Sequence, residues 1–228
     1  MAQRYFLDSL PTHGSFELRG DTAHHLATVL RAKVGEHVRL GDGRGRTVEA
    51  VIRSARKDQV QLEVLASEQA PPPARCVHVA FAPPRLNRAE WLFEHGTEVG
   101  IAVFHPLWTT RTRPQGERPE RWQKIVAAAL GQCDRAWLPR IEPAQELADF
   151  LAQKDLPAHR FLAAAGGPPL QPLAGVQDYL LLVGPEGGFS AGEHDAALAA
   201  GFLPRGLGPH TLRTETAALV GAALLLAQ

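Results

Sequence analysis

Apolar and polar residues alternate along the first third of the chain with the two-residue period of half-buried strands. One apolar stripe with helical spacing interrupts them at residues 21–31, and it begins at Asp21, a residue type that suits a helix N-cap. The strand-like segments are RYFLD, SFELR, EHVRL, RTVEAVIR and QVQLEVL. We therefore predict a small β barrel with one helix over residues 1–70.

A triple proline, Pro71 to Pro73, ends this pattern and marks a linker. Segments with strand and helix patterns alternate beyond it. In order they are CVHVAFA, RAEWLFEHGTEVG, VFHPLW, PERWQKIVAAALGQC, QELADFLAQ, RFLAAA, YLLLVG, SAGEHDAALAAG and a terminal helix. This alternation is typical of an α/β domain with a parallel sheet covered by helices on both faces, which we predict over residues 74–228. Such sheets bind ligands outside the carboxyl ends of their strands, so the loops after LAAA, LLLV and RGL are the first to consider.

Length and cysteine usage fit a cytoplasmic protein. A chain of 228 residues can bury a core without disulfides, and Cys76 and Cys133 are its only cysteines. Asp8 and Pro11 interrupt the start of the chain where an export signal would be apolar. The apolar run at residues 217–227 is well short of the roughly 20 residues that span a bilayer. We expect a soluble protein without a membrane partner.

Charge is balanced overall but uneven along the chain. The 24 Lys and Arg equal the 24 Asp and Glu in number, yet residues 31–57 hold 8 basic residues against 3 acidic ones. Arg outnumbers Lys by 20 to 4. Guanidinium groups suit bidentate phosphate contacts, so nucleic acid is a candidate partner, although a solvated surface explains the same counts equally well.

The loop Gly184-Pro185-Glu186-Gly187-Gly188 directly follows an apolar strand. Glycines at such a place allow close approach of a ligand to the main chain, and Ser190 with Glu193 fits a capping box for the next helix. The loop lacks the Gly-Lys-Ser/Thr of a P-loop and does not match G-x-G-x-x-G. It therefore suits an adenosine without phosphates better than a nucleoside triphosphate, and a simple tight turn is about equally compatible.

A second loop, residues 207–213, leads into the terminal helix, with Thr214 as the expected N-cap and Glu215 in the first turn. The helix carries small residues on one narrow face, and these are Ala217, Ala218, Gly221 and Ala222. Small faces let another backbone approach closely, so we expect this helix to be buried.

Two of these segments, LLVGPEGGFSAGEHDAA and LGPHTLRTETA, resemble the C-terminal signatures of the RsmE family, in the same order and close to the chain end. This SPOUT-superfamily group of methyltransferases modifies uridine N3 in 16S ribosomal RNA of the small subunit. The start of the chain is similar to the family's PUA-like RNA-binding domain, and EWLFEHGTEVGI and GQCDRAWLPRI are similar to its central motifs.

The resemblance implies a C-terminal domain with a deep trefoil knot, which binds S-adenosylmethionine in a bent form and acts as a homodimer in ribosome biogenesis. Cofactor contacts are expected mainly from the main chain of three loops, with Leu207 and Leu212 on either side of the adenine. The expected cofactor-binding residues are Ala164, Gly166, Val183, Gly184, Pro185, Glu186, Gly187, Gly188, Leu207, Gly208 and Leu212.

Methylation of uridine N3 requires loss of its proton and stabilisation of the charge shared with the ring oxygens. Arg213 is the first candidate to stabilise that charge or to hold a phosphate, because its guanidinium stays charged. Glu215 is the available carboxylate and a weak candidate base. The residues expected to contact RNA are Arg4, Arg31, Lys33, Arg44, Arg46, Arg111, Arg113 and Arg135.

The chain departs from the family pattern at His210 and at residues 131–133, which bears on RNA contact more than on the reaction. No metal is expected, since no zinc-finger spacing and no H-E-x-x-H motif occurs. Two other function classes stay open: a non-catalytic RNA-binding module and a nucleotide-binding α/β enzyme of another class.

Overall fold

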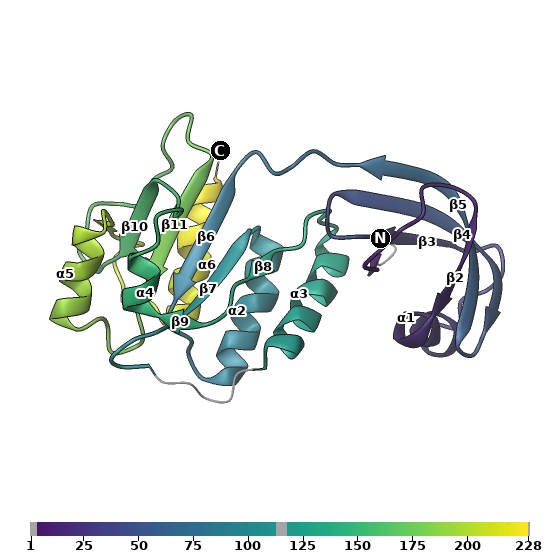
Figure 1. Cartoon of the computed structure of the whole chain (residues 1–228), viewed down its shortest axis with the longest axis horizontal. Helices are drawn as coiled ribbons and strands as arrows, with labels where there is room; N and C mark the ends of the chain where they lie inside the picture. Colours follow the sequence, from purple (N-terminus) through teal and green to yellow (C-terminus); the bar gives the residue numbers. More distant parts are fainter. Residues whose placement is uncertain (1–3, 113–117, 228) are drawn as a thin grey trace. The chain divides into compact units, whose positions relative to one another are not determined.

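The computed structural model describes residues 4–112 and 118–227 (Figure 1). Its contacts divide the chain into two units. The first contains the described residues up to Pro72 together with Ala127–Leu138, and the second contains Pro73–Val126 and the described residues from Pro139 onward. The change of unit at Pro72 coincides with the triple proline, whereas the segment Ala127–Leu138 groups with the first unit and not with the α/β region predicted to contain it. The domain limits at residues 70 and 74 stay a prediction.

The first unit contains a five-stranded sheet in the order β1-β3-β4-β5-β2. Its strands are β1 (Arg4–Phe6), β2 (Ser15–Arg19), β3 (His37–Gly41), β4 (Arg46–Arg56) and β5 (Gln59–Gln69). Alternate side chains such as Leu40, Ile52 and Leu62 are fully buried, which is the period-two pattern of the sequence. The sheet is curled, with two register shifts between β4 and β5. In the part of the chain that the structure describes, the edge strands β1 and β2 do not pair, so the sheet is not closed into the expected barrel.

The helical segment of the first unit differs from its prediction. It consists of α1 (Gly20–His24) and a π-helical turn, η1 (His25–Val29). Arg19 occupies the N-cap and Asp21 lies in the first turn, so the expected cap at Asp21 is wrong by two positions. Ala23 and Leu26 bury the apolar stripe against the sheet core.

The second unit contains a parallel sheet in the order β12-β10-β11-β6-β7-β8, with β9 also paired to β7. Its strands are β6 (Cys76–Phe81), β7 (Val103–Trp108), β8 (Arg140–Ile141), β9 (Gln145–Glu146), β10 (His159–Ala163), β11 (Asp178–Val183) and β12 (Leu203–Arg205). The predicted parallel α/β sheet is confirmed. All of β11 from Tyr179 to Val183 is buried, as expected for a central parallel strand.

Helices cover both faces of this sheet. They are α2 (Leu86–Val99), α4 (Leu147–Leu151), α5 (Ala191–Ala199) and α6 (Thr214–Leu226). A further helix, α3 (Pro119–Cys133), packs Trp122 against Phe93 of α2, and its residues from Ala127 onward belong to the first unit. Leu180 and Leu182 of β11 share a core with α4 and α5, whereas Leu181 packs against α6, which also contacts α2 and β6. Because successive side chains of a strand point to opposite faces, α4 and α5 lie on one face and α2 and α6 on the other (Figure 1).

The terminal helix α6 is buried, as its small residues predicted. Ala218, Ala222 and Leu225 have no exposed surface. A β-carbon on Gly221 would overlap the side chain of Leu181 in β11, so only glycine fits there without movement of the core. The glycine therefore sets how closely α6 packs on the sheet.

Two histidines pair inside the second sheet at β6 and β7. His78 Nδ1 and His105 Nε2 lie 3.2 Å apart, and the rings stack at 5.4 Å. Burial, followed by the charges of His78 and Arg140, lowers the pKa of His105 to about 3. Burial is also the main cause that lowers the pKa of His78. The pair is therefore neutral in the folded protein near pH 7.

No helix among the described residues is long and apolar enough to span a bilayer. Residues 4–112 and 118–227 also contain no group of three or more His, Cys, Asp and Glu side chains able to hold a metal ion.

Candidate active site

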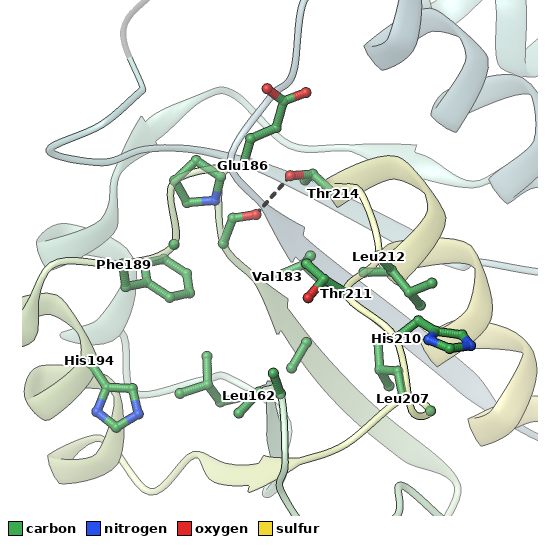
Figure 2. Close-up of a pocket in the computed structure, with 18 residues that line it drawn as sticks. Leu162, Val183, Glu186, Phe189, His194, Leu207, His210, Thr211, Leu212 and Thr214 are labelled. Atoms are coloured by element: carbon green, nitrogen blue, oxygen red, sulfur yellow. Dashed lines mark hydrogen bonds between the residues drawn. The ribbon is translucent and has the colours of Figure 1, made fainter.

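Three loops meet at the carboxyl ends of β10, β11 and β12 and enclose a cavity of about 290 Å³ (Figure 2). These are the loops that the sequence analysis predicted to bind a ligand. They lie together because parallel strands have their carboxyl ends at one edge of the sheet. The lining residues are Leu162, Ala163, Ala164, Ala165, Val183, Gly184, Pro185, Glu186, Gly188, Phe189, His194, Leu207, Gly208, His210, Thr211, Leu212, Thr214 and Ala217.

The loops after β10 and β12 are joined through their main chains. The amide of Gly206 donates to the carbonyl of Pro168 at 2.8 Å, and the amide of Leu170 donates to the carbonyl of Gly206 at 2.9 Å. A β-carbon on Gly206 would lie 2.6 Å from the carbonyl oxygen of Gly167. Glycine at position 206 therefore permits the close approach that gives this side of the cavity its shape.

The loop after β11 is held by α6. Thr214 is the first residue of α6, and its buried hydroxyl donates to the carbonyl of Gly184 at 2.9 Å (Figure 2). Within the loop, the amide of Gly188 donates to the carbonyl of Pro185 at 2.8 Å, which closes a turn. The helix after strand β12 thus fixes the loop after strand β11.

The same loop is fixed at its far end by a capping box. Ser190 accepts from the amide of Glu193 at 3.3 Å, and Glu193 accepts from the amide of Ser190 at 2.8 Å, which confirms the predicted motif. Glu193 also accepts from the amide of Thr110 at 2.7 Å. Burial acts to raise the pKa of Glu193, but the hydrogen bonds from Thr110 and Ser190 together hold this pKa below its ordinary value.

The walls of the cavity are mostly apolar. Side chains of Leu162, Val183, Phe189 and Leu207 surround it, and the carboxylate of Glu186 points away from the enclosed space (Figure 2). Polar contacts for a ligand would therefore come mainly from main-chain amides and carbonyls of the glycine-rich loops. An apolar pocket edged by main-chain donors and acceptors fits a neutral aromatic ring such as adenine better than a triphosphate.

Most of the predicted cofactor residues meet at this cavity. Those that line it are Ala164, Val183, Gly184, Pro185, Glu186, Gly188, Leu207, Gly208 and Leu212. Gly166 lies in an exposed turn outside the lining, and Gly187 lines a neighbouring cavity instead. The role of all eleven residues in cofactor binding stays a prediction.

Several lining residues were not predicted. Phe189 follows the glycine loop and His194 lies on α5, and neither position carries a sequence signal for a ligand. Ala217 was recognised only as a small residue for helix packing. Its place on the first turns of α6, close to the loop after β12, is what brings it to the cavity.

Arg213 and Glu215 flank Thr214 but point to different surroundings. Arg213 is the N-cap of α6 and is exposed, and its side chain has no polar partner among the described residues. The helix therefore begins one residue earlier than expected, and the prediction of Thr214 as N-cap is wrong. The Glu215 side chain is 8% exposed and has Oε1 3.7 Å from Nε of Arg88 on α2, while its Oε2 is buried without a hydrogen bond.

Six of the eight arginine and lysine residues predicted to contact RNA fall into three groups. Arg31, Lys33 and Arg44 are exposed on the first unit, and Arg46 is half-buried. Arg111 is exposed on the second unit and donates to the carbonyl of Gly187. Arg113 lies outside the described residues. Their contacts with RNA stay a prediction.

The structure contradicts the prediction for Arg4. This residue is 5% exposed, and its guanidinium lies 2.7 Å from the carboxylate of Asp134. It also donates to the carbonyl of Arg135, itself half-buried, at 2.8 Å. Arg4 therefore joins β1 to the segment after α3 within the first unit and is not available to a phosphate.

Comparison with known proteins gives one consistent result. Two family models match the chain, an RNA methyltransferase domain over residues 71–226 and an RNA methyltransferase PUA domain over residues 18–65. The ribosomal RNA small subunit methyltransferase E of Mycobacterium bovis is 33% identical over 239 residues, covering 96% of this chain and 89% of the relative. The protein of the same name from Bacillus subtilis is 27% identical and covers 95% of this chain and 93% of its own length.

Solved structures agree. A methyltransferase of Legionella pneumophila in complex with S-adenosylmethionine superposes with a TM-score of 0.88 at 28% identity, covering 99% of this chain and 97% of that one. A ribosomal RNA small subunit methyltransferase E of Neisseria gonorrhoeae bound to S-adenosylmethionine has a TM-score of 0.87 at 25% identity, covering 98% and 96%.

Proposed function

This chain belongs to the RsmE family, the ribosomal RNA small subunit methyltransferases E, and from that premise we propose that it methylates uridine N3 in 16S ribosomal RNA with S-adenosylmethionine as methyl donor. The observation that carries the proposal is the cavity formed by the loops after β10, β11 and β12. Relatives with this fold were solved with S-adenosylmethionine bound. The apolar walls and the bare main chain of residues 184–188 suit its adenosine.

The reaction forms a bond between N3 and the methyl carbon and breaks the bond between that carbon and sulfur, whose electron pair stays with S-adenosylhomocysteine. The proton of N3 must leave before or during the attack. The chain contributes alignment of the two reactants, which by itself can supply a large part of the rate.

Arg213 is the residue that we assign to the developing charge. Its exposed guanidinium lies next to Thr214 in the sequence, and Thr214 lines the cavity. A guanidinium offers donors to the oxygens of the uracil ring or to the adjoining phosphate and remains charged at any pH of interest.

Glu215 suits a positioning role better than the base that the sequence suggested. Its carboxylate is buried, faces Arg88 and is not among the groups that line the cavity. We infer that it orients the start of α6, and that the N3 proton passes to solvent.

The proposal includes three further features that the family resemblance implies: a deep trefoil knot, a homodimer and a cytoplasmic enzyme that acts on the assembled small subunit. Burial of α6 against α2, β6 and β11 supports the knot, because a threaded segment must be slender and Gly221 is in closest contact with β11. Light scattering of the purified protein tests the dimer.

Calorimetric titration with S-adenosylmethionine tests the cofactor part of the proposal. Micromolar binding supports a methyltransferase, whereas a folded sample that binds RNA without binding the donor would indicate a non-catalytic RNA-binding module. Binding of another nucleotide in its place would indicate an α/β enzyme of another class.

A further inference from the structure

A second cavity, of about 480 Å³, lies beside the first within the same unit. Pro185, Glu186 and Thr214 line both cavities, so the start of the loop after β11 forms a shared wall. The second cavity is completed by the loop after β6 and by the residues that follow β7. A ligand in it would therefore lie next to a ligand in the first cavity.

The second cavity has a basic lining, unlike the first. Arg85, from the loop after β6, is exposed, and its side chain has no hydrogen bond or ion pair with any other residue in the described ranges. Arg111, which follows β7, donates through Nη1 to the carbonyl of Gly187. A guanidinium has five N–H groups, so Arg111 keeps donors for a ligand while it holds the wall.

The carboxylate in the lining is already paired. Glu186 accepts from Nη1 of Arg88 on α2, so its charge is balanced from outside the lining. The two remaining charged groups, Arg85 and Arg111, give the cavity a net positive field. Because they approach from two different loops, they suit an anion with several oxygens, such as a phosphodiester.

The remaining lining of the second cavity includes Ala82, three prolines and the hydroxyl-bearing Thr112 and Thr214. Pro83 is buried and Pro84 is half-buried, and neither has an N–H group. Two consecutive prolines provide a fixed surface against which a planar base can pack. The combination of an apolar surface with two guanidinium groups is the chemistry that recognises a nucleotide.

We propose that this second cavity receives the nucleotide of the RNA that is methylated, with Arg85 and Arg111 on its phosphate and Pro83 and Pro84 against its base. The inference rests on the proposed methyltransferase function, since it assigns the acceptor site beside the donor site. The shared wall at residues 185–186 places the two reactants next to each other.

Arg85→Gln tests the proposal, because the Arg85 side chain makes no hydrogen bond or ion pair within residues 4–112 and 118–227 that its loss would disturb. Arg140→Gln is the matched control: Arg140 is an exposed arginine of the same unit, on β8 and outside both cavities. Methyl transfer from tritiated S-adenosylmethionine to unmethylated small subunits gives kcat and KM, and calorimetry gives the donor Kd.

We expect Arg85→Gln to raise KM for the small subunit about tenfold, the usual size of a lost hydrogen bond to a charged group, and to leave kcat and the donor Kd within about twofold. Uridine 5′-monophosphate should inhibit the wild type competitively against the subunit, and about tenfold less strongly the Arg85→Gln variant. Arg140→Gln should match the wild type in all three measurements.

The inference is overturned if Arg85→Gln and Arg140→Gln change KM equally, or if Arg85→Gln weakens donor binding, which would make the second cavity part of the donor site. Uridine 5′-monophosphate inhibition that is equal in wild type and Arg85→Gln also overturns it. A wild type that binds no donor or methylates no uridine contradicts the proposed function instead, so the two failures are distinguishable.

Discussion

Replacement of Thr214 by valine isolates one hydrogen bond beside the cavity that we propose binds the methyl donor. Thr214 is 3% exposed, and its hydroxyl donates to the carbonyl of Gly184 at 2.9 Å. Valine has nearly the same shape and a similar helix propensity, so packing and the start of α6 are kept while the donor is lost. Thr214→Ser keeps the hydroxyl and is the matched control.

The size of the effect follows from burial. A buried acceptor that loses its donor costs about 1–3 kcal/mol, and because Gly184 as a residue is only half-buried, the expected loss is near 1 kcal/mol. A chain of this size then melts about 2–4 °C lower. If the same free energy is needed to order the loop on the ligand, the Kd for S-adenosylmethionine rises about fivefold.

Thermal unfolding and calorimetric titration measure the two quantities on the same samples. The reasoning is refuted if Thr214→Val binds the donor as tightly as the wild type, because the loop after β11 is then held in place without this bond. Weaker binding by Thr214→Ser as well would mean that the methyl group of Thr214 contributes in addition to the hydroxyl.

Three further predictions concern the loops and the sheet. Gly206→Ala should raise the donor Kd at least about tenfold in calorimetry, because a β-carbon 2.6 Å from the Gly167 carbonyl oxygen separates two loops that cannot yield as a flexible side chain would. Ser190→Ala should lower the free energy of unfolding in urea by about 1 kcal/mol, since the cap that accepts from the amide of Glu193 is lost. His105→Leu should reduce the acid sensitivity of the protein's stability. The unfolded chain protonates this histidine below its ordinary pKa of about 6.5, whereas burial lowers the pKa of the folded ring to about 3. The free energy of unfolding of the wild type therefore falls by about 1.4 kcal/mol for each pH unit of acidification between these values.

Each of these predictions has an outcome that contradicts it. A Gly206→Ala variant with wild-type affinity would show that the loops tolerate separation. Unchanged urea midpoints for Ser190→Ala would mean that another group caps α5. If the stability of His105→Leu falls with acid as steeply as that of the wild type, other groups cause the acid sensitivity. A variant of the exposed His13 is the control and should behave like the wild type.

The position of the candidate site could be predicted from the sequence because the patterns that indicate it lie within short segments of the chain. A buried strand followed by glycines fixes the loop at Gly184, and parallel pairing then brings that loop beside the loops after β10 and β12. The capping box at Ser190 needs only residues three apart, and the small residues of α6 indicate close packing by themselves. These features can be predicted without knowledge of contacts between residues far apart in the sequence.

Features that depend on distant contacts could not be predicted. In the sequence, Arg4 has the features of an RNA contact. In the structure its guanidinium is paired with Asp134, which is far away in the sequence. Strands β8 and β9 are two residues long, too short to show a period. The pairing of Arg88 with Glu186 is likewise formed by residues far apart in the sequence. Because such pairs depend on the fold, no local pattern reveals them.

The segment QELADFLAQ shows how tertiary structure overrides a local pattern. Its first two residues form β9 beside β7, and the helix α4 covers only Leu147–Leu151. Phe150 and Leu147 are both buried in the core on the α5 face. Leu147 and Phe150 keep the helical spacing of the segment, whereas Gln145 and Glu146 pair with β7 and do not join the helix.

Mass spectrometry of small-subunit RNA shows directly whether the protein methylates uridine N3. Unmethylated small subunits are incubated with the protein and S-adenosylmethionine, and the RNA is digested and its nucleosides are identified. We expect N3-methyluridine at one position of 16S RNA with the wild type and a strongly reduced yield with Gly206→Ala. A folded protein that binds S-adenosylmethionine but leaves uridine unmethylated, or that places the methyl group on another nucleoside, would contradict it.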